Sequence, residues 1–375
     1  RGPAGAARPP GAVRGVAPTC GGARAGWRGT QHEAWGSGEG SGRAGRNDAD
    51  ALVWAPEGEF GEGSNRWQGP QEAELVQALA ELYRVRPEQL LVGRGSDEAI
   101  DLLLRAFCRA GQDAIIINPP TFGMYAIGAR VQDAAVIEVP LAEDFTPDAE
   151  AILAAWTPAV KLVFVCGPNN PTGKRIDPAV IARLAEGLRD KAMLVVDEAY
   201  VEFAEDASSA SALLERHDHV AVLRTLSKAW GLAGARIGCL LADATVIDLL
   251  RRIMAPYPLP VPSIRAAMEA LSADARPLAR QRVDIVLRQR QRLVEALAGR
   301  PGVREILPSD ANFIAVRLDD PGEAYRRLLA AGIVVRDIRK YPRLGDALRI
   351  SIGTPEENDR LLAVLGAWLA EEGQA

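Results

Sequence analysis

Residues 220–241 read VAVLRTLSKAWGLAGARIGCLL, in which a polar turn rich in glycine and alanine joins two apolar runs. The apolar runs are typical of buried strands. The turn carries Lys228, with Thr225 and Ser227 before it and Arg236 after it. Lysine forms Schiff bases with carbonyl compounds, arginine and hydroxyl groups bind phosphate, and small residues let a ligand approach the backbone. The stretch indicates a site for a phosphorylated carbonyl compound, although taken alone it is more often an ordinary surface turn.

Strand-like and helix-like segments alternate on both sides of this stretch. Continuous apolar strands joined by crossover helices predict an α/β fold, with a three-layer α/β/α large domain around a mainly parallel sheet. The expected strands lie at 89–92, 114–117, 135–139, 162–165, 193–196, 220–223 and 237–241. The expected helices lie at 72–83, 98–108, 122–130, 148–156 and 178–188.

The chain after residue 241 has a different pattern, in which helices come first and short strands follow. Helices are expected at 245–254, 265–299, 322–331 and 355–369, and strands at 312–316, 333–335 and 348–352. This order predicts a smaller α+β C-terminal domain. We therefore expect a large domain over residues 70–262 and a small domain over residues 263–375.

The first 69 residues are low in complexity. Residues 1–51 contain no Leu, Ile, Phe, Tyr or Met, and 13 of the first 46 residues are glycine. Such a segment cannot bury enough apolar surface to offset the entropy lost on ordering. We expect residues 1–69 to be disordered or divergent, and we place no chemistry there. A targeting segment is the second interpretation, because the first 32 residues carry five Arg and no acid.

The composition of the 375 residues excludes several classes of protein. The net charge of −5 gives no basis for binding nucleic acid, and no apolar run approaches the length needed to span a bilayer. Four widely spaced cysteines and three histidines indicate neither a disulfide framework nor a metal site. A protein of the reducing cytoplasm fits this usage.

Polar side chains directly follow several of the expected strands. Ser96 and Asp97 stand in the turn GRGSDE at the start of a helix, where backbone N–H groups favour an anion. The loop PNNPTG at 168–173 follows a later strand, and the segment DEAY at 197–200 follows the next one. Each has an ordinary explanation as a turn or a cap. Because ligands bind beyond the carboxyl ends of the strands in such sheets, their combination around one lysine predicts a single site.

Further motifs extend this pattern over residues 72–366. They are GRGSDEAIDLLLRAFC, PPTFGMY, PNNPTG, DEAYVEF, RTLSKAWGLAGARIG, APYPLPVPS, SDANF, VVRDIRK and LRISIGTPEEN. With them the chain resembles the fold-type I pyridoxal-phosphate enzymes of the class I/II aminotransferase group. It is most similar to the histidinol-phosphate aminotransferase family.

The resemblance implies pyridoxal 5'-phosphate as the cofactor and a role for each motif residue. Lys228, Asp197 and Tyr200 are the expected catalytic residues. Lys228 would bind the cofactor covalently and move the substrate proton, and Asp197 would pair with the pyridine nitrogen. Tyr200 and Asn170 would hydrogen-bond the ring hydroxylate, and Phe122 would stack on the ring. The cofactor phosphate would be held by Ser96, Asp97, Thr225, Ser227 and Arg236.

The resemblance also implies the substrates and the setting. Arg336 and Arg349 would bind the phosphate of L-histidinol phosphate and, in the other half of the reaction, glutamate or 2-oxoglutarate. Tyr257 would reach the substrate phosphate. A homodimer in the cytoplasm, acting in L-histidine biosynthesis without nucleic-acid or membrane partners, completes the expectation.

The chain departs from the family at two places. Phe122 stands where a tyrosine is common, and Trp67-Gln68-Gly69 follows Arg66 where an arginine-tyrosine-proline segment is usual. Three alternatives remain open: a phospho-amino-acid decarboxylase, a broad aromatic aminotransferase, and a catalytically impaired protein that still binds the cofactor. Product analysis, activity on phenylalanine or tyrosine, and cofactor binding without transamination would distinguish them.

Overall fold

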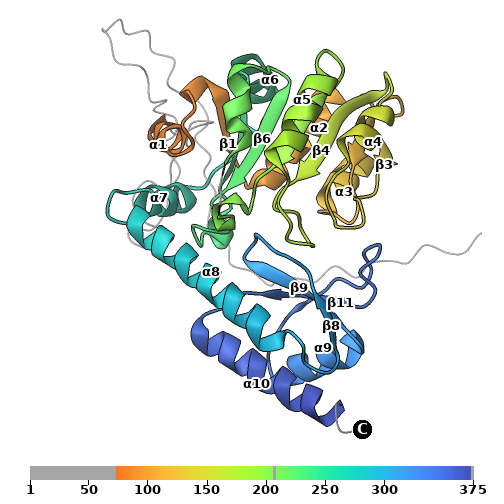
Figure 1. The fold of residues 1–375 in the computed structure, drawn as a ribbon. Helices are drawn as coiled ribbons and strands as arrows, with labels where there is room; N and C mark the ends of the chain where they lie inside the picture. The colour runs from red at the N-terminus through yellow and green to blue at the C-terminus, as the bar shows by residue number, and fades with distance from the viewer. Residues whose placement is uncertain (1–72, 206–207, 373–375) are drawn as a thin grey trace, which may run out of the picture. The chain divides into compact units, whose positions relative to one another are not determined.

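The computed structural model describes residues 73–205 and 208–372. The predictions for residues 1–69 and for Trp67 lie outside these residues. The described part contains two sheets, one of seven strands and one of four (Figure 1). In this part of the chain no helix combines the length and apolar character needed to cross a bilayer.

The seven-stranded sheet has the order β1-β7-β6-β5-β4-β2-β3. Its strands β2 to β6 pair in parallel, whereas β7 is antiparallel to both of its neighbours, β1 and β6. The sheet is therefore mainly parallel, as the sequence predicts. The strands are β1 (Leu90–Gly93), β2 (Ala114–Ile117), β3 (Ala135–Glu138), β4 (Val160–Cys166), β5 (Met193–Asp197), β6 (Val220–Thr225) and β7 (Gly238–Ala242).

Alternating side chains of the central strands enter two separate cores, one on each face of the sheet. In β4, Val163 and Val165 belong to one core, and Leu162 and Phe164 belong to the other. Because successive residues of a strand point to opposite faces, a continuous apolar run buries both faces. The first core contains α1 (Ala73–Tyr83), α4 (Ala149–Ala154), α5 (Pro178–Leu188) and α7 (Val261–Ala270), and the second contains α2 (Ser96–Phe107), α3 (Met124–Val131) and α6 (Ala244–Ile253).

The four-stranded sheet is antiparallel, in the order β10-β11-β9-β8. Helices α8, α9 and α10 pack on it around a core that includes Trp368 and Ile314. The strands are β8 (Val303–Ile306), β9 (Phe313–Leu318), β10 (Arg336–Asp337) and β11 (Ala347–Ser351), and the helices are α8 (Arg276–Leu297), α9 (Pro321–Ala330) and α10 (Pro355–Glu372). This is the smaller α+β part expected from the sequence, and the boundary at residue 262 stays a prediction.

Two expected elements of this part differ from the structure. The helix-rich stretch expected over 265–299 consists of two helices, the end of α7 and all of α8, because a turn at residues 271–275 separates them and Pro277 lies in the first turn of α8. The strand expected at 333–335 is absent, and the pairing begins one residue later, at Arg336. The short strand β8 has only half-buried and exposed side chains, so its apolar pattern is too weak to predict it.

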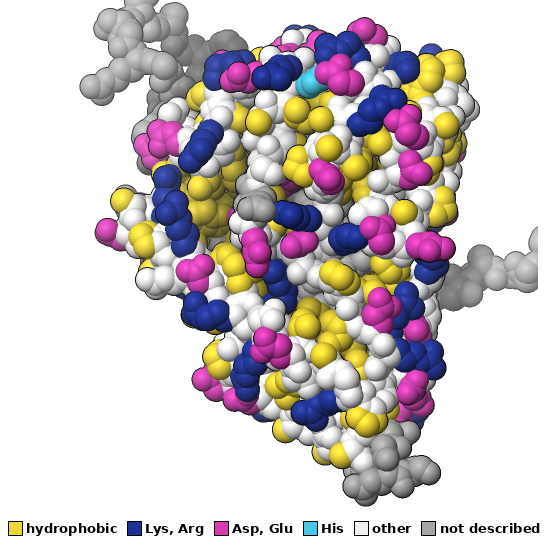
Figure 2. Space-filling model, in the orientation of Figure 1, with side chains coloured by type: hydrophobic (Ala, Val, Ile, Leu, Met, Phe, Trp, Pro, Cys, Tyr) yellow, Lys and Arg dark blue, Asp and Glu magenta, His cyan; other side chains and the backbone are white. Residues whose placement is uncertain are grey.

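The surface carries both signs of charge. Figure 2 shows basic and acidic side chains interspersed over the visible face of the molecule. Several of them form exposed ion pairs, such as Arg183 with Glu150 and Arg304 with Asp319. Such pairs add little to stability individually, so the large apolar cores are the main source of it.

Candidate active site

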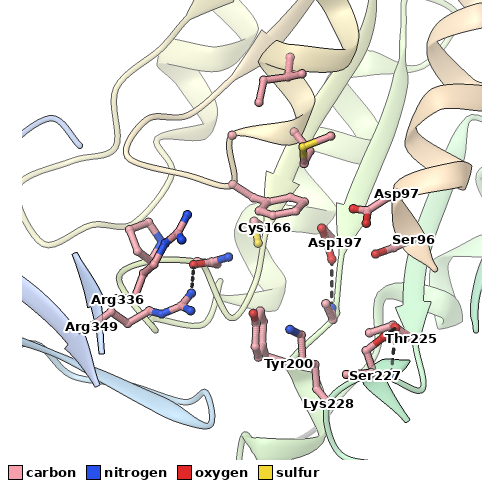
Figure 3. A pocket seen from close by; sticks show the side chains of 18 of the residues that line it. Ser96, Asp97, Cys166, Asp197, Tyr200, Thr225, Ser227, Lys228, Arg336 and Arg349 are labelled. Carbon is pink, nitrogen blue, oxygen red and sulfur yellow. Dashed lines mark hydrogen bonds between the residues drawn. The ribbon is translucent and has the colours of Figure 1, made fainter. Parts of the chain in front are cut away.

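A cavity of about 420 Å³ lies beyond the carboxyl ends of β4, β5 and β6, and strands β10 and β11 of the second sheet also contribute to it. Its size suits a small ligand. Figure 3 shows Arg336 and Arg349 on one side, Ser96, Thr225 and Ser227 on the other, and Lys228 and Tyr200 between them. The cavity is lined by Ser96, Asp97, Phe122, Gly123, Met124, Ile127, Cys166, Asn170, Pro171, Asp197, Ala199, Tyr200, Thr225, Ser227, Lys228, Ala233, Arg236, Arg336, Ile338, Tyr341 and Arg349.

One end of the cavity lies at the start of α2. Gly95 precedes the helix with φ 78°, which a glycine adopts without strain, and the first N–H groups of the helix lie beyond it. The Arg236 guanidinium lies over this turn, because a Cβ on Gly95 would come within 2.6 Å of its Nη2. Free helix N–H groups and a guanidinium together favour a phosphate.

Hydroxyl groups and a carboxylate complete this end. The Ser227 N–H donates to Thr225 Oγ1 over 3.1 Å, which turns the chain directly after β6. Arg236 Nη1 is 3.5 Å from Ser227 Oγ, and Nη2 donates to Asp97 Oδ2 over 3.2 Å. The Asp97 side chain therefore holds Arg236, and because a carboxylate repels phosphate, its contribution to an anion site would come from its backbone N–H.

Asp197 is a buried carboxylate at the end of β5. Its two oxygens accept hydrogen bonds from the Tyr125 hydroxyl, over 2.6 Å, and from the Ala199 N–H, over 3.0 Å. Burial raises the pKa of Asp197, and these two hydrogen bonds lower it. A buried carboxylate that faces a cavity is suited to binding a cationic group.

Lys228 follows β6 and lies within the cavity, with its Nζ 5.2 Å from the centroid of the Tyr200 ring. Burial lowers the pKa of Lys228, and the charge of Arg349 lowers it further. A lysine in such surroundings is more readily a neutral amine, which is the form that attacks a carbonyl or accepts a proton. Burial raises the pKa of Tyr200, so its phenol stays protonated and can donate a hydrogen bond.

The other end of the cavity carries two arginines of neighbouring strands, since Arg336 in β10 pairs in register with Arg349 in β11. Arg349 Nη1 donates to Asn170 Oδ1 over 2.6 Å, and its guanidinium lies 4.7 Å from the Phe313 ring centroid. Burial lowers the pKa of Arg349, and its buried Nε has no hydrogen-bond partner among the described residues. A buried guanidinium with an unused donor is suited to binding an anion.

All but one of the site residues expected from the sequence line this cavity. The exception is Tyr257, which is half exposed and does not line it, so its role stays a prediction. Sequence reasoning missed Cys166, Tyr341 and Ile338, which line the cavity, and Tyr125, which contacts Asp197. Cys166 could have been found, because it directly follows the strand predicted at 162–165 and precedes the PNNPTG loop, whereas Tyr341 lies just outside the VVRDIRK motif.

The residues of the cavity fit pyridoxal 5'-phosphate. This cofactor carries a phosphate, an aldehyde and a ring nitrogen that can be protonated. The start of α2 with Arg236 suits the phosphate, Lys228 suits the aldehyde, and the buried Asp197 suits the protonated nitrogen. The Phe122 ring lines the same cavity and offers an apolar face to the cofactor ring.

Known proteins support the same assignment. The sequence profile of the family "Aminotransferase class I and II" matches residues 34–365. The histidinol-phosphate aminotransferase of Stenotrophomonas maltophilia is 50% identical over 324 residues, which are 85% of this chain and 89% of the relative. The enzyme of the same name from Xanthomonas euvesicatoria is 50% identical over 322 residues, 85% of this chain and 88% of the relative.

A solved structure agrees with the sequence relatives. The histidinol-phosphate aminotransferase of Sinorhizobium meliloti, in complex with pyridoxal 5'-phosphate, superposes with a TM-score of 0.74 at 27% identity, covering 82% of this chain and 83% of that one. The chain therefore belongs to the class I and II aminotransferase family of pyridoxal-phosphate-dependent enzymes, and within it to the histidinol-phosphate aminotransferases.

Proposed function

We propose that the protein reversibly transfers an amino group between L-histidinol phosphate and 2-oxoglutarate, giving imidazole-acetol phosphate and glutamate. The observation that supports this most directly is that the cavity carries arginine side chains at both ends, Arg236 on one side of Lys228 and Arg336 with Arg349 on the other (Figure 3). The site at the start of α2 would hold the cofactor phosphate. The site of Arg336 and Arg349 would then remain for the anionic group of a substrate.

The paired arginines explain how one site can accept two substrates. A guanidinium binds a phosphate or a carboxylate through the same parallel N–H groups. Arg336 and Arg349 would therefore bind the phosphate of L-histidinol phosphate in one half of the reaction and a carboxylate of glutamate in the other. Figure 3 shows both arginines projecting from the four-stranded sheet into the cavity.

Bound pyridoxal phosphate supplies a protonated ring that takes up the electron pair released when the substrate Cα–H bond breaks. Lys228 Nζ would accept that proton and return it, which the lowered pKa of its amine favours. Asp197 would keep the ring nitrogen protonated. Tyr200 and Asn170 would donate hydrogen bonds to the ring oxygen, and Arg349 orients the Asn170 amide by binding its Oδ1.

Absorbance spectra of the purified holoenzyme test this function. Adding L-histidinol phosphate should convert the visible band of the bound cofactor to the band of its amine form, and 2-oxoglutarate should restore it. Lys228→Ala should abolish turnover, because no other lysine lines the described part of the cavity. A holoenzyme that L-histidinol phosphate leaves unchanged, or a Lys228→Ala enzyme with full activity, would contradict the proposal.

Control substrates separate the remaining alternatives. L-phenylalanine should react much more slowly, because it lacks the phosphate that the paired arginines bind. L-threonine phosphate should give no carbon dioxide; its release would instead indicate a decarboxylase. The homodimer and the cytoplasmic location that the resemblance implies stay predictions, and sedimentation of the holoenzyme tests the first.

A further inference from the structure

Tyr125 is a fully buried residue in the first turn of α3 that touches two groups of the active site. Its hydroxyl donates to Asp197 Oδ2 over 2.6 Å. Its ring meets the Phe122 ring edge-on, with centroids 5.6 Å apart and an interplanar angle of 81°. On its other side it stacks on Phe164 of β4, at 4.7 Å and 14°. Tyr125 therefore connects the carboxylate and the aromatic ring that both face the cofactor position.

The contacts of Tyr125 restrict its movement. Phe164 belongs to the apolar core of the sheet, so stacking on it ties the Tyr125 ring to a rigid strand. The edge-on contact with Phe122 is a favoured arrangement of two aromatic rings. The Tyr125 oxygen is therefore fixed in position next to Asp197 Oδ2, and a donor at a fixed position favours a single orientation of the carboxylate.

The hydrogen bond also decides which lone pairs of Asp197 are available. An ionised carboxylate can accept about four hydrogen bonds. The Ala199 N–H uses one position on Oδ1, and the Tyr125 hydroxyl uses one on Oδ2. The carboxylate is thereby held at both oxygens, and it keeps lone pairs for a protonated ring nitrogen.

We propose that Tyr125 is a positioning residue of this enzyme: its hydroxyl orients Asp197, and its ring orients Phe122, so that one side chain places the two groups that enclose the cofactor ring. The proposal rests on pyridoxal phosphate occupying this cavity, and it does not depend on which amino donor the enzyme uses. Without the hydroxyl, Asp197 Oδ2 would lie buried without its donor and would become the stronger base. The shared proton would then move from the ring nitrogen toward Asp197.

The test compares Tyr125→Phe with Tyr83→Phe. Both substitutions remove one hydroxyl and keep a buried ring, but Tyr83 lies in α1, does not line the cavity and faces Arg224 at 4.6 Å. Four quantities are measured: the Kd of the apoenzyme for pyridoxal phosphate, the pH dependence of the single-turnover rate with glutamate, the KM for glutamate, and the melting temperature of the apoenzyme. The use of glutamate keeps the test valid if L-histidinol phosphate is not the substrate.

Tyr125→Phe should raise the Kd for pyridoxal phosphate by about tenfold, the effect of one hydrogen bond to a charged group. The acidic limb of the rate profile should move to higher pH, because the Asp197 carboxyl then keeps its proton up to a higher pH. The KM for glutamate should stay within about twofold, since Tyr125 does not line the cavity. Tyr83→Phe should leave all three catalytic quantities unchanged.

Two results would overturn the proposal. The first is a Tyr125→Phe enzyme whose Kd and acidic limb match the wild type, whatever its melting temperature, because the hydroxyl would then only fill space. The second is a Tyr83→Phe enzyme with the same losses, because the effect would then belong to the removal of any buried hydroxyl.

Discussion

Individual charged residues of this site are held in unfavourable surroundings. Asp197 is buried, and Lys228 and Arg349 are half-buried. Burial raises the pKa of Asp197 and lowers the pKa of Lys228 and of Arg349, which favours the neutral form of each. Burying these charged groups destabilises the unliganded protein, and binding a ligand of opposite charge offsets that loss. Clusters of shifted groups in a cavity are typical of active sites.

The first prediction concerns Arg349. Arg349→Ala removes a buried guanidinium, so the KM for both L-histidinol phosphate and glutamate should rise by about 10- to 100-fold, the range for a hydrogen-bonded charge. The Kd for pyridoxal phosphate should change much less, because we place the cofactor phosphate at the start of α2, away from Arg349. Arg349→Lys should recover only part of the loss, since an ammonium cannot bind in a parallel fork.

Steady-state kinetics of both half-reactions check this, with Arg326→Ala as the control. Arg326 is an exposed arginine of α9 that pairs with Glu323 outside the cavity. An unchanged KM for both substrates in Arg349→Ala would rule out the assigned role.

The second prediction concerns the pH dependence of stability through Asp197. Burial raises the pKa of Asp197, so the folded apoenzyme binds this proton more tightly than the unfolded chain does. The resulting stability is present below the ordinary pKa of about 4 and is lost as the pH rises through the raised value. Asp197→Asn should therefore raise the melting temperature of the apoenzyme at pH 8, by roughly 1–3 °C, and less so near pH 4. It should also abolish tight cofactor binding.

Asp113 provides a control of opposite sign. The hydrogen bond from Arg109 holds the pKa of Asp113 well below its usual range, so this carboxylate contributes stability at neutral pH that is lost on acidification. Asp113→Asn should lower the melting temperature at pH 8. A fall of the same size for Asp197→Asn would show that its charge stabilises the apoenzyme, contrary to the prediction.

Among the secondary-structure elements, β1, β7 and the start of α2 approach one another closely at the site. Gly93 of β1 lies opposite Gly238 of β7 in the antiparallel register. A Cβ on Gly238 would lie 2.5 Å from the Ser96 backbone nitrogen, at the start of α2. Strand β7 therefore needs a glycine at this position so that the start of α2 can pack against it. The proposed phosphate site at the start of α2 depends on this close packing.

The third prediction tests this junction. Gly238→Ala should push the first turn of α2 away from β7, raise the Kd for pyridoxal phosphate and destabilise the protein by about 1–3 kcal/mol, as overpacking does. Gly234→Ala, in the turn before β7, is the matched control, since a Cβ there meets no atom within 4 Å. Chemical unfolding and cofactor titration measure both effects. Equal results for the two variants would show that the junction is not tight.

For the molecule as a whole, the question is what keeps the paired arginines over the cofactor site. Phe145, in the segment after β3, packs in an apolar cluster with Ile338, Leu344 and Ala347, which lie in and between β10 and β11 of the four-stranded sheet. The Phe145 ring lies 4.5 Å from the Arg343 guanidinium, which in turn donates to the Ala142 carbonyl over 3.0 Å. This contact ties the four-stranded sheet to the seven-stranded one.

The fourth prediction is that Phe145→Ala loosens this connection. The KM for both substrates should rise several-fold, because Arg336 and Arg349 would be held less firmly. The Kd for pyridoxal phosphate should stay the same, because α2, Asp197 and Lys228 belong to the seven-stranded sheet region. The φ of 61° at Phe145 is unfavourable for alanine too, so the substitution removes the side chain without relieving the backbone.

Val334→Ala is the control for Phe145→Ala. Val334 is 80% exposed and precedes β10, so its loss should leave the KM values unchanged. A Phe145→Ala enzyme that melts earlier but keeps both KM values would show that the contact serves stability alone.

The parallel sheet, and the side chains that gather at its edge, follow from the amino-acid pattern alone. Apolar runs buried on both faces, such as 162–165 and 193–196, identify central strands from composition alone. Residues that directly follow parallel strands lie at the same edge of the sheet, so the sequence alone predicts that Lys228 and Asn170 lie close together, and both line the cavity. Their chemical roles stay predictions until the variants are measured.

Which side chains contact one another at that edge depends on the packing of distant segments. Tyr125 binds Asp197 across 72 residues, and Arg349 binds Asn170 across 179 residues. The packing of Phe145 against the four-stranded sheet likewise joins segments that are far apart in the sequence. Local patterns carry information about neighbours along a helix or strand, whereas a hydrogen bond between distant segments depends on how the elements pack, and packing is fixed by side-chain volumes summed over the whole core.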